Sequence, residues 1–311
     1  MTVAPPPPFP TVDRYAAPPS ARVPVVTVVV PTRDEVDSVD ELVERIRRAM
    51  TTVDAEYEIL FVDDSDDGTP RAVAVHERAG APVRLLHRCP GERSGGLGGA
   101  LAAGFTAARG EFVVCLDGDL QHPPELLAPM TRLLLDRRAD IVVATRYIPG
   151  GGVDGLDGVW RRLVSATSRD LTRVVLPRLR ATSDPGSGCF GFDRAVIDGV
   201  VLRPRGFKTL VEVMARGRWE RLAEVPYHFV ARGHGRSHAT AKEGFRALRH
   251  LAGLASDRTL PRRTPVADRT LHSIPLDPRT GADGPTALVV CPPLPAAAQA
   301  ERTARTERRT A

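Results

Sequence analysis

Two aspartates separated by one residue, Asp117 and Asp119, follow a short apolar run at residues 112–116, and Gln121 comes two residues later. Oxygen-bearing side chains at this spacing can bind a hard divalent cation, because Mg²⁺ and Mn²⁺ prefer oxygen ligands and keep positions open for a diphosphate. A cation held there would neutralise the negative charge that develops on a leaving nucleoside diphosphate. The motif alone leaves a second interpretation open, a solvated loop whose aspartate caps a helix.

A second acidic cluster, at residues 63–69, follows the apolar run at residues 58–62. A carboxylate there could accept hydrogen bonds from a nucleobase or a ribose, or the cluster could be the start of a helix capped by Asp67 or Thr69. We exclude a calcium loop of the EF-hand type, because its twelfth position would be Ala74 instead of glutamate and because a strand precedes it.

A glycine-rich segment at residues 95–99 lies between a predicted strand and a predicted helix. It lacks the G-x-G-x-x-G spacing of a dinucleotide-binding turn, and the strand before it is the third in the chain and not the first. A tight turn with a helix packed closely behind it accounts for the glycines at least as well.

The segments that carry these clusters alternate between strand-like and helix-like patterns. Continuous apolar, β-branched runs such as residues 25–30 are typical of strands buried on both faces, and apolar residues at helical spacing follow a predicted capping box of Ser38 and Glu41. This order predicts an α/β fold with a mostly parallel central sheet, helices on both faces, and ligands bound beyond the carboxyl ends of the strands. The predicted strands are residues 25–30, 58–62, 83–86, 111–116 and 141–145, and the predicted helices are residues 38–50, 69–79, 98–108 and one opened by Pro123 and Pro124.

Composition divides the chain of 311 residues into three parts. Residues 1–22 are rich in proline and residues 258–311 in Arg, Thr, Pro and Ala, so we expect both to be disordered and residues 23–257 to form one folded domain. Nine arginines and five acidic residues in the C-terminal segment supply most of the net charge of +5, so the rest lacks the basic field of a nucleic-acid-binding protein. The sequence shows no signal peptide, membrane-spanning run or paired cysteine motif, which favours the reducing cytoplasm.

Taken together, the order and spacing of the motifs resemble one enzyme family. Along residues 25–152 the segments PTRDE, DDSDDGT, the glycine-rich turn, LDGDLQHPPE and TRY follow one another as in the family-two inverting glycosyltransferases, with the greatest similarity to the dolichol- or polyprenol-phosphate mannosyltransferases. Later matches at residues 184–188 and 225–237 extend the resemblance over residues 25–240. The resemblance implies a GT-A fold, the α/β fold of nucleotide-diphospho-sugar transferases.

Carried over by position, the resemblance implies roles for individual residues. The metal ligands would be Asp117, Asp119 and Gln121. The sugar nucleotide would be bound by Pro31, Arg33, Glu35, Asp63, Asp64, Arg93, Gly118 and Asp119. The acceptor phosphate would be bound by Arg146, Arg232 and Ser237, and the catalytic residues would be Asp119, Arg146 and Arg232.

The resemblance also implies a reaction, the transfer of a hexose from a sugar nucleotide to a polyprenyl or dolichyl phosphate with inversion at the anomeric carbon. GDP-mannose is the favoured donor, and Mg²⁺ or Mn²⁺ is the expected cofactor. The alternatives are UDP-glucose or another sugar nucleotide as donor, a soluble acceptor, and an inactive nucleotide-binding subunit of an envelope-assembly complex.

A lipid acceptor requires a membrane surface, so we expect a peripheral protein on the inner face of the cell membrane. Residues 160–180 and 242–254 show the pattern of basic amphipathic helices, which can lie in an anionic interface. An ordinary helix that covers the sheet is the alternative for each segment, and a separate membrane-anchoring subunit is an alternative to direct contact.

Overall fold

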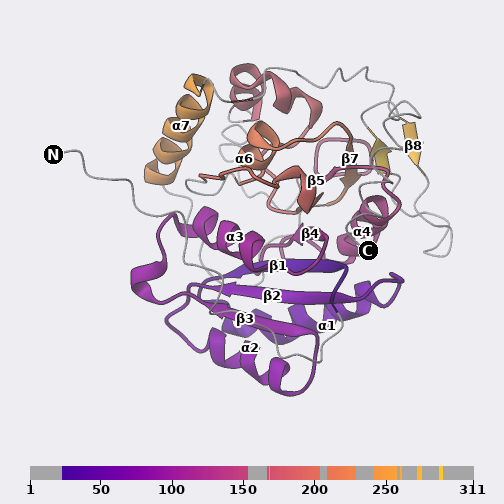
Figure 1. The fold of residues 1–311 in the computed structure, drawn as a ribbon, viewed down its shortest axis with the longest axis vertical. Coiled ribbons are helices and arrows are strands. Elements are labelled where there is room, and N and C mark those ends of the chain that lie inside the picture. The colour runs from indigo at the N-terminus through magenta and orange to yellow at the C-terminus, as the bar shows by residue number, and fades with distance from the viewer. Residues whose placement is uncertain are drawn as a thin grey trace.

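The computed structural model describes residues 23–152, 167, 169–203, 209–228, 241–257, 260, 272–274 and 287–289. Its strands form one sheet in the order β3-β2-β1-β4-β6-β5-β7-β9-β8 (Figure 1). The strands are β1 (Val26–Thr32), β2 (Tyr57–Asp63), β3 (Val83–His87), β4 (Phe112–Cys115), β5 (Ile141–Thr145), β6 (Phe190–Asp193), β7 (Leu222–Pro226), β8 (His272–Ile274) and β9 (Ala287–Val289).

The strand directions confirm the predicted mostly parallel sheet. β1 pairs in parallel with β2 and β4, β2 with β3, and β5 with β7. β6 lies between β4 and β5 and is antiparallel to both. The sequence analysis did not predict β6, and the antiparallel direction of β6 determines where the loop before it lies. Because β6 begins where β4 and β5 end, the loop before it reaches the carboxyl edge of the sheet.

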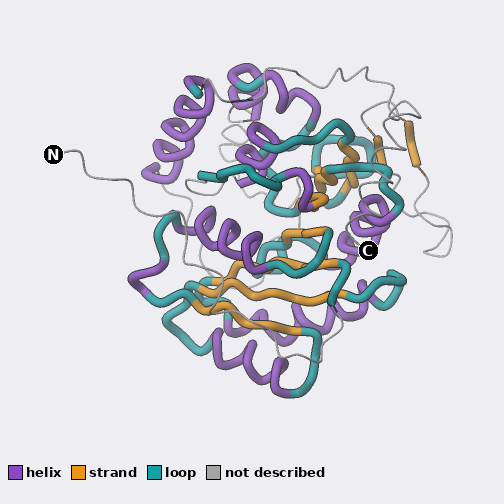
Figure 2. The backbone as a smooth tube through the Cα atoms, viewed as in Figure 1, coloured by secondary structure: helices purple, strands orange, loops and turns teal. Residues whose placement is uncertain are grey.

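Helices cover both faces of the sheet, as predicted, and Figure 2 shows the strands between them. α1, α2 and α4 contribute to the core on one face, and α3, α6 and α7 contribute to the core on the other. The helices are α1 (Val39–Met50), α2 (Thr69–Arg78), α3 (Gly96–Ala107), α4 (Leu127–Leu135), α6 (Thr209–Arg216) and α7 (Ala241–Ser256). Short 3-10 helices are η2 (Val36–Ser38), η3 (Pro90–Glu92), η4 (Pro124–Leu126), η5 (Pro177–Ala181) and η6 (Arg194–Val196).

Two helix starts differ from the predictions. The Ser38 side chain makes no capping hydrogen bond, because Ser38 ends the turn η2 and already has helical backbone angles (φ −98°, ψ −17°). The predicted capping box was therefore wrong. α3 begins at Gly96, two residues earlier than predicted, because Gly95 takes the left-handed conformation (φ 84°) that glycine adopts without strain and so starts the helix.

The second predicted amphipathic helix is present as α7, and one side of its described part packs on the protein. Leu251 and Leu254 are buried in the core, and Nε2 of His250 is 2.9 Å from Oε1 of the buried Glu212 in α6. This part of the apolar face is therefore not available to a membrane, and the alternative of a covering helix holds for it. None of the described helices is long and apolar enough to cross a bilayer.

Two short strands lie within the C-terminal segment that we expected to be disordered. β9 pairs with Ala223 and Glu224 of β7, and β8 pairs with β9. For these six residues the structure differs from the expectation, because β9 extends the sheet from the edge of β7, β8 extends it from β9, and this pairing provides partners for their backbone groups. Most of residues 258–311, and all of residues 1–22, lie outside the described residues, so the domain boundaries stay predictions.

Candidate active site

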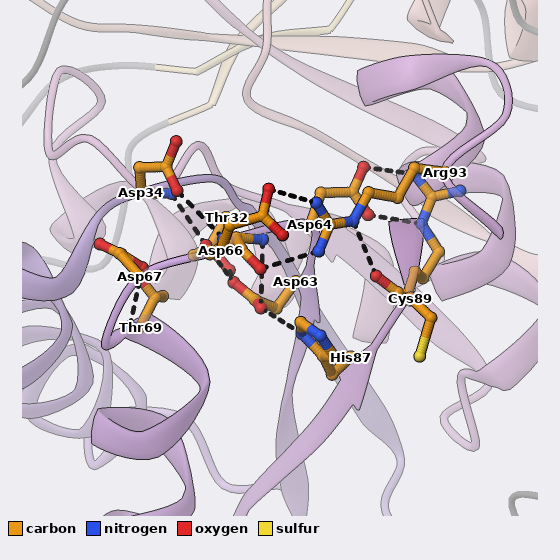
Figure 3. A network of polar contacts seen from close by, with 12 residues as sticks. Thr32, Asp34, Asp63, Asp64, Asp66, Asp67, Thr69, His87, Cys89 and Arg93 are labelled. Carbon is orange, nitrogen blue, oxygen red and sulfur yellow. Dashed lines mark hydrogen bonds and ion pairs between the residues drawn. The ribbon is translucent and has the colours of Figure 1, made fainter. Parts of the chain in front are cut away.

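The carboxyl ends of three neighbouring strands bring the acidic cluster together. In the register of the sheet, Thr32 at the end of β1 lies opposite Asp63 of β2, and Asp63 lies opposite His87 at the end of β3. The loops that follow these strands bring further polar side chains alongside, and Figure 3 shows them as one connected network. The parallel sheet therefore gathers residues that are far apart in the chain at one edge, as expected for this topology.

Asp63 lies at the centre of this network and is 0% exposed. Its Oδ1 accepts hydrogen bonds from Thr32 Oγ1 (2.8 Å) and Ser65 Oγ (2.6 Å), and its Oδ2 is 2.6 Å from His87 Nδ1. Because an ionised carboxylate can only accept, Nδ1 of His87 donates, and the imidazole is held in one orientation. Asp63 thus positions its neighbours, and the predicted direct contact with a nucleoside would need these hydrogen bonds to rearrange.

Asp64 forms a buried ion pair with Arg88, a residue that the sequence analysis did not single out. Nε and Nη2 of Arg88 donate to Oδ1 and Oδ2 of Asp64 at 2.7 and 2.5 Å. Nη2 also donates to the carbonyl oxygen of Gly96 at 3.2 Å. The pair therefore ties the end of β2 to the glycine-rich turn. That turn requires Gly99, where a Cβ would lie 2.0 Å from the carbonyl oxygen of Ser94.

Arg93, a predicted nucleotide-binding residue, joins the loops after β2 and β3. Its Nη1 donates to Asp66 Oδ2, its Nη2 to the carbonyl oxygen of Ser65 and its Nε to the carbonyl oxygen of Arg88, each at 2.8 Å. The hydrogen bond from Arg93 lowers the pKa of Asp66 below its ordinary value. Arg93 therefore fixes the shape of these loops, in addition to any contact that it makes with a ligand.

The segment after β1 carries two further predicted nucleotide-binding residues, the exposed Arg33 and the half-buried Glu35. The N–H of Asp34, which has φ 59°, donates to the loop after β2 at 2.8 Å, and the N–H of Glu35 donates to Thr69 Oγ1 at 3.0 Å. Oδ1 of Asp67 in turn accepts hydrogen bonds from N and Oγ1 of Thr69. The acidic cluster thus secures the start of α2 as well as the loop after β1.

The predicted metal-binding loop lies beside the end of β1. The backbone of Gly118 is so close to Pro31 that a Cβ would be 3.0 Å from the carbonyl oxygen of Pro31. Gly188, in the loop before β6, approaches Asp117 in the same way, and a Cβ there would be 2.2 Å from Oδ2. Nδ1 of the buried His122 lies 3.2 Å from the same oxygen. Asp117 is therefore held between its own loop and the loop before β6.

The side chains of this loop fit a hard divalent cation by ligand type and accessibility. Asp117 is 29% exposed along its side chain, and Asp119 and Gln121 are half-buried. The carboxylate of Asp117 occupies the place where a side chain at position 188 would begin, so the glycine allows Asp117 its position. Within the described part of the chain, no three His, Cys, Asp or Glu side chains are grouped as a metal site. Two carboxylates and an amide suit an open site whose remaining ligands come from a diphosphate.

Arg146, a predicted acceptor-phosphate residue, forms a bidentate ion pair with Asp184. Its Nε donates to Oδ2 at 2.8 Å and its Nη2 to Oδ1 at 3.1 Å, and Asp184 is only 2% exposed. Burial alone would lower the pKa of Arg146, but the charge and hydrogen bonds of Asp184 outweigh it, and the pKa is raised. The pair uses the Nε–Nη2 edge of the guanidinium, so Asp184 fixes the orientation of Arg146.

The remaining predicted acceptor-phosphate residues, Arg232 and Ser237, lie outside the described residues. The sequence analysis did not identify two residues as ion-pair partners in the site, Arg88 and Asp184. Arg88 directly follows β3, and its position at the end of a predicted parallel strand is a signal that could have identified it. The pairing of Asp184 with Arg146 depends on the reversed strand β6, for which the sequence pattern gave no signal.

Residues 27–200 match the domain of glycosyl transferase family 2. The chain is 34% identical over 226 residues to a dolichol-phosphate mannosyltransferase from Pyrococcus furiosus, a match that covers 73% of this chain and 62% of the relative. It is also 34% identical over 238 residues to a dolichol-phosphate mannosyltransferase from Saccharomyces cerevisiae, covering 73% of this chain and 86% of the relative. The chain therefore spans less than two thirds of the first relative and most of the second.

Solved structures share the fold at lower identity. Glucosyl-3-phosphoglycerate synthase from Mycobacterium tuberculosis, in complex with Mn²⁺, UDP and phosphoglyceric acid, superposes with a TM-score of 0.54 at 20% identity, covering 75% of this chain and 79% of that one. Mannosyl-3-phosphoglycerate synthase from Rubrobacter xylanophilus gives 0.51 at 20% identity, with 88% and 86% covered. These matches confirm the predicted GT-A fold. The domain match and the mannosyltransferase relatives show that the chain belongs to glycosyl transferase family 2.

Proposed function

We propose that the chain transfers a hexose, mannose from GDP-mannose, to a polyprenyl phosphate with inversion at the anomeric carbon. The observation that carries the proposal is the loop before β6, which touches both halves of the predicted site. Asp184 in this loop holds Arg146 by two hydrogen bonds, and Gly188 lies against Asp117. A carboxylate pair suited to the cation that binds a nucleoside diphosphate and an arginine suited to a phosphate are thus linked by one short loop.

On the donor side, Asp117, Asp119 and Gln121 would hold Mg²⁺ or Mn²⁺. When bound, the cation would neutralise the negative charge on the leaving diphosphate. The nucleoside would lie over the ends of β1 to β3, where Asp64 and Arg93 keep the loops in one arrangement through their contacts with Arg88. A nucleotide that meets preformed loops loses less free energy to their ordering.

On the acceptor side, the proposed nucleophile is an oxygen of the lipid phosphate. A phosphate monoester has a second pKa of about 6, so it is largely ionised at neutral pH and needs no general base. The protein must instead orient two anions and reduce their repulsion. Arg146 suits this task because Asp184 fixes its guanidinium and keeps it charged. Arg232 and Ser237 are proposed to complete the phosphate site.

Membrane contact is proposed through the segment around η5. Leu171 is 41% exposed and Val174 is 67% exposed, with Arg173 between them in the chain and the exposed Arg180 after them. Exposed apolar side chains among arginines suit the boundary between anionic headgroups and acyl chains. Such contact would place the protein at the inner face of the cell membrane. A separate anchoring subunit could add to this contact.

Radiolabelled GDP-mannose, polyprenyl phosphate in detergent and Mg²⁺ or Mn²⁺ provide the test. We expect label to enter the organic phase on solvent extraction, more from GDP-mannose than from UDP-glucose, and not when EDTA is present. Label transferred only to water-soluble products would refute the lipid acceptor. Metal-dependent nucleotide binding without any turnover would refute the enzymatic proposal as a whole.

A further inference from the structure

Glu224 is a buried carboxylate in β7 to which the proposed reaction assigns no role. Its side chain is almost inaccessible, at 3% exposure, and its Oε1 accepts three hydrogen bonds. The donors are Thr182 Oγ1 (2.8 Å), Ser183 N (2.6 Å) and Ser183 Oγ (3.0 Å). Burial raises the pKa of Glu224, and these hydrogen bonds only partly oppose the effect. Among the described residues, no arginine, lysine or histidine forms an ion pair with Glu224 to offset that burial.

The hydrogen-bond donors to Glu224 adjoin both members of the Arg146–Asp184 pair. Ser183 directly precedes Asp184, and its Oγ lies 2.6 Å from Oγ1 of Thr145, which directly precedes Arg146. Oγ1 of Thr182, which donates to Glu224, also accepts a hydrogen bond from the N–H of Asp184 at 3.2 Å. One carboxylate oxygen therefore restrains the chain beside the arginine and the chain beside its partner.

The sheet places Glu224 where it can reach both segments. β5 and β7 run in parallel, with Val143 opposite Glu224 and Thr145 opposite Pro226. The segment of residues 182–184 precedes the reversed β6, which pairs with the other side of β5. Glu224 on β7 therefore binds the segment that leads into β6, although β7 and β6 lie on opposite sides of β5.

We propose that Glu224 is a positioning residue, which fixes the Arg146–Asp184 pair in the orientation that receives the acceptor phosphate. This inference rests on the proposed role of Arg146. The positioning would act through one atom of Glu224, because Oε1 accepts all three hydrogen bonds. Glutamine retains such an oxygen, while methionine has a similar volume and no strong acceptor. The two substitutions therefore separate hydrogen bonding from space filling.

The test compares Glu224→Met, Glu224→Gln and Ser183→Ala with the exposed Glu220→Met as a matched control. We expect Glu224→Met to lower kcat/KM for polyprenyl phosphate by about 100-fold, as a misplacement of about 1 Å does, with GDP affinity changed less than about threefold. Glu224→Gln should recover at least about tenfold of that loss. Ser183→Ala removes the link to Thr145 without removing Glu224, and we expect it to give the same selective loss. It keeps the proposal testable if Glu224→Met does not fold.

A second readout does not depend on turnover. The NMR signal of the Arg146 Nε–H, assigned by its disappearance in Arg146→Lys, should exchange slowly in the wild type and in Glu224→Gln. It should exchange faster in Glu224→Met and Ser183→Ala. Wild-type transfer and slow exchange in every variant, or an equal loss of GDP affinity and transfer, would overturn the inference. A wild-type chain that does not act on polyprenyl phosphate would refute the proposed function, and the exchange rates would still decide whether Glu224 positions Arg146.

Discussion

Replacing Gly188 with alanine should damage transfer by displacing Asp117. A Cβ at this position would lie 2.2 Å from Oδ2, 2.8 Å from Cγ and 2.9 Å from Oδ1 of Asp117. Carbon atoms do not approach oxygen closer than about 3.0 Å, so the carboxylate would have to retreat by about 0.8 Å. A ligand displaced by about 1 Å at a reacting centre costs about 100-fold in rate, or about 2.7 kcal/mol of transition-state stabilisation.

The fold should tolerate the same change, because the clash is with the end of a partly exposed side chain. We expect the free energy of unfolding to change by about 1 kcal/mol or less, as measured by urea denaturation. The matched control is Gly186→Ala in the same loop, where the Cβ would meet only Oδ1 of Asp184 at 3.8 Å, an ordinary contact. The assays are the transfer rate and the Mn²⁺ concentration for half-maximal activation. A Gly188→Ala protein that matches Gly186→Ala in both would refute the assignment of Asp117 to the metal.

Three further predictions concern the donor site, the acceptor site and the C-terminal segment. Asp119→Ala should abolish transfer in a protein that stays folded by circular dichroism, because the diphosphate charge is left uncompensated, and normal turnover would remove Asp119 from the site. Arg232→Lys should lower the transfer rate by at least about tenfold and GDP-mannose affinity much less, because an ammonium cannot bind phosphate through two parallel hydrogen bonds; equal losses would argue against an acceptor role. Removal of residues 258–311 should leave activity on detergent-solubilised acceptor intact, since a segment rich in Arg, Thr, Pro and Ala offers too little apolar surface to offset the entropy of ordering it. A folded but inactive product would show that this segment belongs to the enzyme.

The parallel part of the sheet could be predicted from local sequence. The strands β1 to β5 are largely apolar runs, and their observed ends differ from the predicted ones by at most two residues. The acidic residues at those ends were recognised as a site because parallel strands end at one edge. The hydrogen bonds among them could not be predicted, since they join residues of different strands, such as Asp63 of β2 and His87 of β3. A pattern places a carboxylate at an edge and does not say whether it faces a ligand or a neighbour.

The other half of the site could not be predicted, because it depends on one short reversed strand. β6 has only four residues, Phe190–Asp193, and includes a glycine, so it gives no long apolar run, and its alternation is too short to identify a strand. Nothing in such a segment specifies its direction. The positions of Asp184 beside Arg146 and of Gly188 beside Asp117 both follow from that direction.

The two halves of the site therefore differ in how the sequence encodes them. The proposed donor half lies on the ends of parallel strands, each followed by its own helix, and local patterns along the chain specify it except for the contact of Gly188 with Asp117. The acceptor half is assembled by β6 and completed by Glu224 on β7, so its geometry depends on contacts between residues 38 and 42 positions apart in the chain. Substitutions at the distant contacts should therefore alter acceptor use while the nucleotide network around Asp63 stays intact. Because the two halves are separate, substitutions in the proposed acceptor half would change the acceptor specificity and leave the structure of the proposed donor half unchanged.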